Sequence, residues 1–325
     1  MVQKQREEKH NINSAKLAEV YTNYGIFFIL IIVFIVSALV VDNFVSTDNL
    51  LSVINQNSIT VILACGVTML IVSGNMDLSA GMLLIVANVT CAAILQATNN
   101  VLLACVGAIA VAVLGEMING IAISYLNLNG FIVTLATQLV YKGVALLICK
   151  GTPIYGTPQI TFMAQSKVLG IPILIIFMLI CVVVVHFILS KTSFGRYLYA
   201  IGGNRFTAQA SGINVKKIVF INFIIMGIFA GIAGILFTAR TNSGQPSSAD
   251  ITFDAIIATV LGGTSMAGGS GVVVGTVAGA LVVGIINNIM NLGGVSPYFQ
   301  NIVKGIIIFL AILIDKKTRD TIMKV

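Results

Sequence analysis

Few residues of this chain could do chemistry, and they stand between long apolar runs. The carboxylic acids placed clearly inside apolar sequence are Asp77 and Glu116. An ionisable side chain at membrane depth points to a functional site by default, because burying its charge in hydrocarbon is costly. The other interpretation of Asp77 is structural, as a cap of the helix expected to begin near Leu78. Both interpretations stay open on the sequence.

Amide side chains inside apolar runs form a second group. Asn and Gln carry both donors and acceptors, so they can bind a polyhydroxylated ligand or hydrogen-bond across helices. The residues predicted to lie along a substrate pathway are Asn75, Asp77, Ser79, Asn119, Gln138 and Asn287. Hydrogen bonding between helices alone is the alternative for the amides.

No nucleotide-hydrolysing or metal-binding motif accompanies these residues. The sequence contains no G-x-x-x-x-G-K-[ST] phosphate loop and no H-E-x-x-H motif, and its five cysteines lack metal-ligand spacing. We therefore predict no catalytic residue, no metal and no cofactor bound by this chain. If the chain is part of a pump, its energy must come from elsewhere, most simply from a separate subunit that hydrolyses ATP.

Composition places these residues in a membrane protein. Of 325 residues, 58% are hydrophobic and 9% are charged, whereas about a quarter are charged in soluble proteins. Runs long enough for spans of about 20 residues predict an all-α polytopic membrane protein with about ten transmembrane helices, two of them interrupted by glycine-rich turns. The net charge of +7 lies in short loops beside the spans, which is typical of membrane topology and does not indicate nucleic acid.

The order of polar segments predicts one transmembrane domain, residues 25–315, between cytoplasmic tails at 1–24 and 316–325. Val41–Asn57 has two aspartates and no Lys or Arg, so we expect it to be an external segment before a short span at Ser58–Ser73. Ten spans place both tails and the basic loop at 190–217 on the same, cytoplasmic side.

Two interrupted segments resemble each other. Leu70–Asn88 and Thr259–Gly279 each consist of an apolar run, a glycine-broken polar turn and a second apolar run. Backbone groups freed at membrane depth must face protein or a water-filled cavity, and broken helices in two halves of a chain point to a translocation pathway. Chance similarity between two glycine-rich segments is the alternative.

The basic loop at 190–217 is the longest polar interruption within the apolar region. Asn204 is a predicted helix N-cap and Gly212 a predicted helix stop, which indicates about two turns of helix at the membrane surface. A short exposed helix of this kind fits a groove in a partner protein. A basic loop that only anchors the topology is the alternative.

Five colinear motifs carry a family resemblance. They are GNMDLSAG (Gly74–Gly81), GFIVTLAT (Gly130–Thr137), TSFGRYLYAIGGN…ASGINV (Thr192–Val215), FDAIIATVLGGTSMAGGSGVVVGTVAGAL (Phe253–Leu281) and VSPYFQNIVKGIIIFLAILID (Val295–Asp315). At these motifs the chain resembles the permease subunit of bacterial ABC monosaccharide importers of the ribose, galactose and xylose type. The likeness extends from about Leu50 to Asp315.

The resemblance implies a homodimeric, non-enzymatic permease in the bacterial cytoplasmic membrane that carries a monosaccharide. It also implies two partners, a cytoplasmic ATPase that binds the ATP and an extracellular or periplasmic sugar-binding protein. The residues that it predicts to dock the ATPase are Gly203, Asn204, Arg205, Ala208, Ser211 and Gly212. The alternative function is a secondary carrier or channel that works alone on a small polar solute.

Overall fold

The computed structural model describes residues 25–246 and 251–322. The predicted amino-terminal tail, 1–24, lies outside the described residues. The predicted carboxy-terminal tail begins inside a helix that continues to Ile322.

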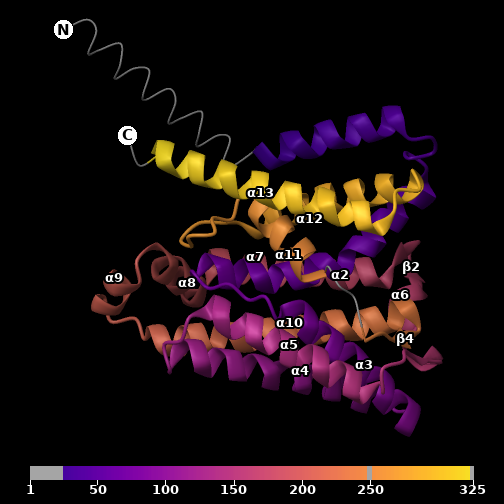
Figure 1. Ribbon diagram of the computed structural model, residues 1–325, viewed down its shortest axis with the longest axis horizontal. Helices are drawn as coiled ribbons and strands as arrows, with labels where there is room; N and C mark the ends of the chain where they lie inside the picture. The colour runs from indigo at the N-terminus through magenta and orange to yellow at the C-terminus, as the bar shows by residue number, and fades with distance from the viewer. Residues whose placement is uncertain (1–24, 247–250, 323–325) are drawn as a thin grey trace, which may run out of the picture.

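Regular structure in the described residues is almost entirely helical (Figure 1). After the helix Gly25–Val40, the helices are α2 (Thr47–Val72), α3 (Ala80–Thr98), α4 (Val101–Ser124), α5 (Gly130–Ile148), α6 (Phe162–Gln165), α7 (Ile173–Lys191), α8 (Ser193–Gly203), α9 (Arg205–Ala210), α10 (Val215–Thr241), α11 (Ile251–Leu261), α12 (Val273–Leu292) and α13 (Pro297–Ile322). Four two-residue strands and a short 3-10 helix lie between them: β1 (Ile154–Tyr155), Pro158–Ile160, β2 (Lys167–Val168), β3 (Ile171–Pro172) and β4 (Ser243–Gly244).

Seven of these helices, α2, α3, α4, α5, α7, α10 and α12, are long and apolar enough to cross a membrane. Three shorter apolar stretches are also helical, at Gly25–Val40, Ile251–Leu261 and Pro297–Ala311. The all-α polytopic membrane class is therefore confirmed, while the count of ten spans stays a prediction. The glycine-rich breaks follow α2 and α11.

The second span begins earlier than predicted. Ser46 caps α2 by accepting a hydrogen bond from the backbone N–H of Asn49 at 3.3 Å, so the predicted span start at Ser58 is wrong. The expected external segment is helical from Thr47 onwards. The misleading signal was the pair of aspartates, Asp42 and Asp48, with no Lys or Arg before Asn57. The polar run Asn55–Ser58 stays helical, and Arg240 of α10 donates to the carbonyl oxygen of Gln56 at 3.2 Å.

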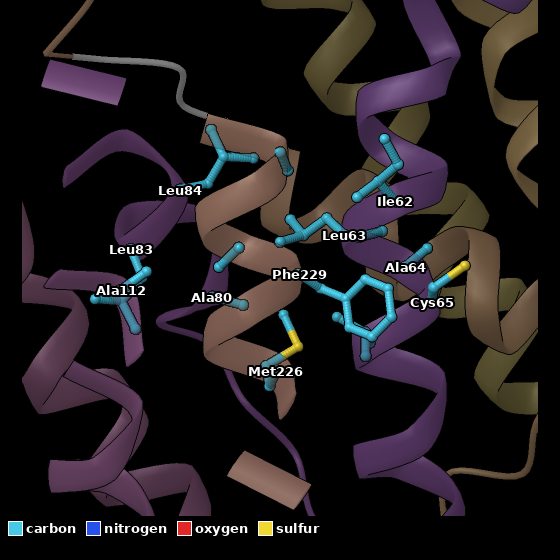
Figure 2. Packing of buried hydrophobic residues seen from close by; sticks show 14 of the residues in the cluster. Ile62, Leu63, Ala64, Cys65, Ala80, Leu83, Leu84, Ala112, Met226 and Phe229 are labelled. Carbon is cyan, nitrogen blue, oxygen red and sulfur yellow. The ribbon is translucent and has the colours of Figure 1, made fainter. Parts of the chain in front are cut away.

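The core is built where α2, α3, α4 and α10 pack together. Met226 and Phe229 of α10 point toward α2 (Figure 2), where Gly66 leaves room for them. On the opposite face of α10, a Cβ on Gly227 would lie 2.7 Å from the Cα of Val113 on α4. Small residues at these crossings allow the helix backbones to approach closely, which is how helices associate in membranes.

The two ends of the helices carry different structures. α8 and α9 lie at one end of the molecule, and the strands and α6 lie at the other (Figure 1). At that second end β1 pairs with β4, with Tyr155 opposite Ser243, so the loop after α5 is joined to the end of α10. The long helices therefore run between these two ends of the molecule, and α8 and α9 mark one of the ends.

Candidate functional site

The α8–α9 segment, Ser193–Ala210, is set by local capping chemistry. Thr192 accepts a hydrogen bond from the N–H of Gly195 at 3.1 Å, and Asn204 accepts one from the N–H of Thr207 at 3.0 Å. Gly212 has a positive φ of 84°, a conformation that favours glycine after a helix. The predicted short helix between Asn204 and Gly212 is thus confirmed, with α8 as a further helix before it.

The predicted docking residues are mostly on the surface of this segment. Gly203, Asn204, Arg205, Ser211 and Gly212 are exposed, whereas the side chain of Ala208 is buried. Sequence reasoning missed Phe206, whose side chain is 87% exposed at the start of α9. An aromatic residue inside a polar, basic loop was the signal that could have identified it.

Glycine backbones join the α8–α9 segment to both breaks, and we call this contact the glycine junction (Gly74, Gly202, Gly203, Gly268 and Gly269). A Cβ on Gly268 would lie 2.9 Å from the Cα of Gly74 and 3.0 Å from that of Gly202. A Cβ on Gly269 would lie 2.9 Å from the Cα of Gly203. The end of α8 therefore touches the turn after α2 and the turn after α11 directly, main chain against main chain.

Two hydrogen bonds reinforce the junction. The N–H of Gly269 donates to the carbonyl oxygen of Val72 at the end of α2, at 2.9 Å. The hydroxyl of Tyr199 in α8 donates to the carbonyl oxygen of Gly271 at 2.6 Å. Burial raises the pKa of Tyr199, so this phenol keeps its proton at neutral pH and remains a donor. Displacing α8 must disturb both breaks.

Asp77 belongs to a buried polar network that connects the start of α3 to α4 and α5. Its Oδ1 accepts the N–H of Ser79 at 2.8 Å and the Ser79 hydroxyl at 2.6 Å. The side-chain N–H₂ of Asn119 donates to Ser79 Oγ at 2.8 Å and to Glu116 Oε2 at 3.1 Å. Thr137 in turn donates its hydroxyl to Asn119 Oδ1 at 2.8 Å. These contacts give Asp77, Ser79 and Asn119 structural roles, and their place on a substrate pathway stays a prediction.

The two acids of this network face each other. Asp77 and Glu116 are 2% and 0% exposed, and their side chains interact directly. Among the described residues, no N–H or O–H donor is bonded to Asp77 Oδ2 or Glu116 Oε1. Ser79 and Asn119 donate hydrogen bonds to the two carboxyl groups, so the contact between the acids depends on these two neighbours.

The contact between Asp77 and Glu116 predicts how substitutions of Glu116 behave. Glu116→Gln keeps the shape and supplies an N–H donor toward Asp77, so the unfolding temperature in detergent should change little. Glu116→Leu leaves the Asp77 oxygen and the Asn119 amide without their partner, which costs on the order of 1–3 kcal/mol per buried polar group. The difference in thermal stability between the two purified variants measures this. Equal stability of the two variants would show that the contact of Glu116 with Asp77 and Asn119 does not stabilise the fold.

The other predicted pathway residues lie elsewhere. Asn75 bonds locally, donating to the Oγ of Ser73 at 3.0 Å. Gln138 is half-buried on α5 and takes no part in the hydrogen bonds of the Asp77 network. Asn287 on α12 lines a separate polar cavity together with Lys304. The six residues therefore do not form one site. Within the described ranges, no group of three His, Cys, Asp or Glu residues could hold a metal ion.

Comparisons with known proteins give the family. The family model described as "Branched-chain amino acid transport system / permease component" matches residues 49–312. The ribose import permease protein RbsC of Escherichia coli is 38% identical over 295 residues, covering 89% of this chain and 92% of that protein. RbsC of Bacillus subtilis is 38% identical over 297 residues, covering 90% and 91%. The D-allose transport system permease protein AlsC of Escherichia coli is 36% identical over 321 residues, covering 97% of each chain.

No solved structure matches this chain significantly. The family model nevertheless spans most of the sequence, and it includes both breaks, the α8–α9 segment and all six residues predicted for the pathway. On this coverage, the chain belongs to the branched-chain amino acid transport system / permease component family.

Proposed function

We propose that the chain is the transmembrane permease subunit of an ABC importer for a monosaccharide. The observation that carries this proposal is the likeness to permeases named for ribose and D-allose transport, over 89% and 97% of the chain. Seven helices long and apolar enough to span a membrane support the same role. The chain carries no phosphate loop, so ATP is bound and hydrolysed by a separate subunit and the permease itself catalyses no bond chemistry.

The ATPase docks on the exposed surface around Gly203–Gly212, at the end of the molecule that carries α8 and α9. When the ATPase binds ATP, it displaces α8, and the glycine junction passes this displacement to the turns after α2 and α11. Two copies of the chain enclose the route for the sugar in the bacterial inner membrane, with both termini in the cytoplasm. A binding protein delivers the sugar at the opposite end, where β1 and β4 lie.

The arrangement of acids favours this importer over a carrier that works alone. A carrier driven by an ion gradient needs ionisable groups that exchange ions with the pathway. Asp77 and Glu116 are 2% and 0% exposed and engaged with each other and with Ser79 and Asn119. In these positions the two acids hold the segment before α3 against α4. The energy for transport comes from the ATPase.

Reconstituted vesicles test the proposal. The permease, its ATPase and its binding protein are reconstituted together, and uptake of radiolabelled D-ribose, D-allose and L-arabinose is measured with and without ATP. We expect uptake of at least one sugar that requires ATP and both partners. Equal uptake by the permease alone, or no ATP-dependent uptake of any of the three sugars, would overturn the assignment.

A further inference from the structure

A polar cavity of about 260 Å³ lies between α2, α10, α11, α12 and α13. It receives Gln56 from the first half of α2 and Arg240 from the last turn of α10. The opposite end of α2, at Val72, contacts the α8–α9 segment. The cavity therefore lies toward the end of the molecule away from the proposed ATPase surface. A sugar arriving from outside the cell would meet this end first.

Amide side chains dominate the lining. They are Gln56, Asn57, Asn287, Asn288, Asn291 and Gln300. Each amide both donates and accepts hydrogen bonds, and so does each hydroxyl of a sugar, so the two chemistries match. Two other cavities in the described residues have apolar linings and offer no such match, one beside Leu30 and Phe34, the other beside Met76 and Phe253.

One of these amides is buried without a partner. Asn57 is 7% exposed, and its Nδ2 has no hydrogen-bond acceptor among the described residues. A buried N–H₂ without an acceptor costs about 1–3 kcal/mol. Gly284 on α12 leaves the space that this amide occupies, because a Cβ there would overlap the Asn57 side chain. Gly284 therefore lets the Asn57 amide pack closely against α12 in the cavity wall, where its N–H₂ group still lacks an acceptor.

Charged groups complete the lining. Lys304 of α13 binds Asp254 of α11, with Nζ 2.9 Å from Oδ1. Arg240 donates one N–H to the carbonyl oxygen of Gln56 at 3.2 Å, and a guanidinium carries five N–H donors in a planar fork. Such a fork suits two adjacent hydroxyl oxygens. Two cations and one anion line the cavity, so its formal charge is +1, and competition by acidic sugars must be tested.

Hydrogen bonds between α2 and α12 lie on both sides of the cavity along α2. Near the start of α2, Asn49 and Asn288 exchange two amide hydrogen bonds of 3.2 and 3.0 Å. Toward the α8–α9 end, the buried hydroxyl of Thr68 bonds to that of Thr276 on α12 at 2.8 Å. Thr68 lies eight residues beyond Thr60 of the lining, or about 12 Å along a helix. The threonine contact therefore separates the cavity from the glycine junction.

We propose that this cavity is a binding site for one neutral monosaccharide, held through adjacent hydroxyl groups. Asn57 and Asn287 bond the hydroxyls from α2 and α12, and Arg240 offers its fork to two neighbouring oxygens. The proposal rests on the importer function stated above. It adds that the sugar occupies this cavity of each copy before it enters the route that the two copies enclose.

Leucine substitutions test the site in the same vesicles. We expect Asn57→Leu and Asn287→Leu each to lower ATP-dependent uptake by about tenfold, which corresponds to the loss of a hydrogen bond worth about 1.4 kcal/mol. Copurification of the ATPase should not change. Gln96→Leu is the matched control, because Gln96 is an exposed amide that bonds Tyr155 at the same end of the molecule, outside the cavity. If the wild-type permease takes up sugar and both cavity variants take it up equally well, the cavity is not a binding site. The importer function would still hold.

A labelling experiment tests sugar binding in the cavity without a transport measurement and without the leucine variants. Asn287→Cys is treated with a small methanethiosulfonate reagent in detergent, with the wild-type permease as the background for the five native cysteines. We expect high millimolar D-ribose, D-allose or L-arabinose to slow labelling of the new thiol several-fold. No protection by any of the three sugars would overturn the site. Protection by D-glucuronate alone would also overturn it, because the ligand would then be an acidic sugar.

Discussion

Gly202→Val is expected to abolish most ATP-driven sugar uptake while the permease remains in the membrane. At this position a Cβ would overlap the carbonyl oxygen of Val72 and would lie 2.5 Å from the backbone N of Gly269. Main-chain atoms cannot rotate away as a side chain does, so the end of α8 must move out of the glycine junction. Overpacking of this kind costs about 1–3 kcal/mol, which lowers the population of the arrangement with an intact junction by about 5-fold to 150-fold.

Three measurements make the Gly202 result interpretable. Copurification of the ATPase reports docking, ATP hydrolysis reports the partner's activity, and sugar uptake reports coupling between them. Gly143→Ala is the matched control, because that helical glycine of α5 has open space around it. Tyr199→Phe removes only the bond to the Gly271 carbonyl and should give a smaller loss of uptake with normal folding. Wild-type uptake by both Gly202→Val and Tyr199→Phe would show that the junction does not transmit motion.

Phe206→Ala is expected to weaken binding of the ATPase by about 30-fold or more. The side chain is 87% exposed on α9, next to the cap residue Asn204, and an exposed aromatic residue on a docking surface is the usual centre of binding energy. Truncation of such an anchor costs about 2–4 kcal/mol. Because the ring contributes little to the permease's own core, the thermal stability of the isolated chain should stay unchanged.

Binding of the purified ATPase to immobilised permease measures the effect of Phe206→Ala directly. Gln209→Ala serves as the control, since Gln209 is exposed on the same short helix and is not aromatic. Arg205→Glu can be measured alongside, because Arg205 is exposed next to Phe206 and is one of the predicted docking residues. An unchanged dissociation constant for Phe206→Ala would remove α9 from the ATPase interface.

Local chemistry made part of this structure predictable. The helix between Asn204 and Gly212 follows from a side-chain cap and a glycine stop, which act within a few residues. The membrane class follows from composition. The start of α2 was predicted wrongly because the charges of Val41–Asn57 indicated an external segment, and charge alone does not show where a helix begins. In the structure Asn57 lines the polar cavity and the carbonyl of Gln56 binds Arg240.

The site needed tertiary information. Asn287 was predicted from its place in an apolar run, and it lines the polar cavity. Arg240 and Lys304 come from other helices, and no spacing along the chain connects them to Asn287. The same holds for Asp77 and Glu116, which meet although they are far apart in sequence. Glycine-rich turns were visible in the sequence as well, but the contact of Gly268 with Gly74 and Gly202 depends on how α2, α8 and α11 pack.

The glycine junction has a mechanical consequence. Where side chains meet, a small push is partly absorbed by rotation about their χ angles, so that the far element lags behind the near one. At Gly202, Gly268 and Gly74 there are no such torsions, and main-chain atoms are already in contact. The end of α8 and the two turns therefore move together as one rigid unit. A displacement of α8 is therefore expected to reach the turns after α2 and α11 together and at nearly full amplitude.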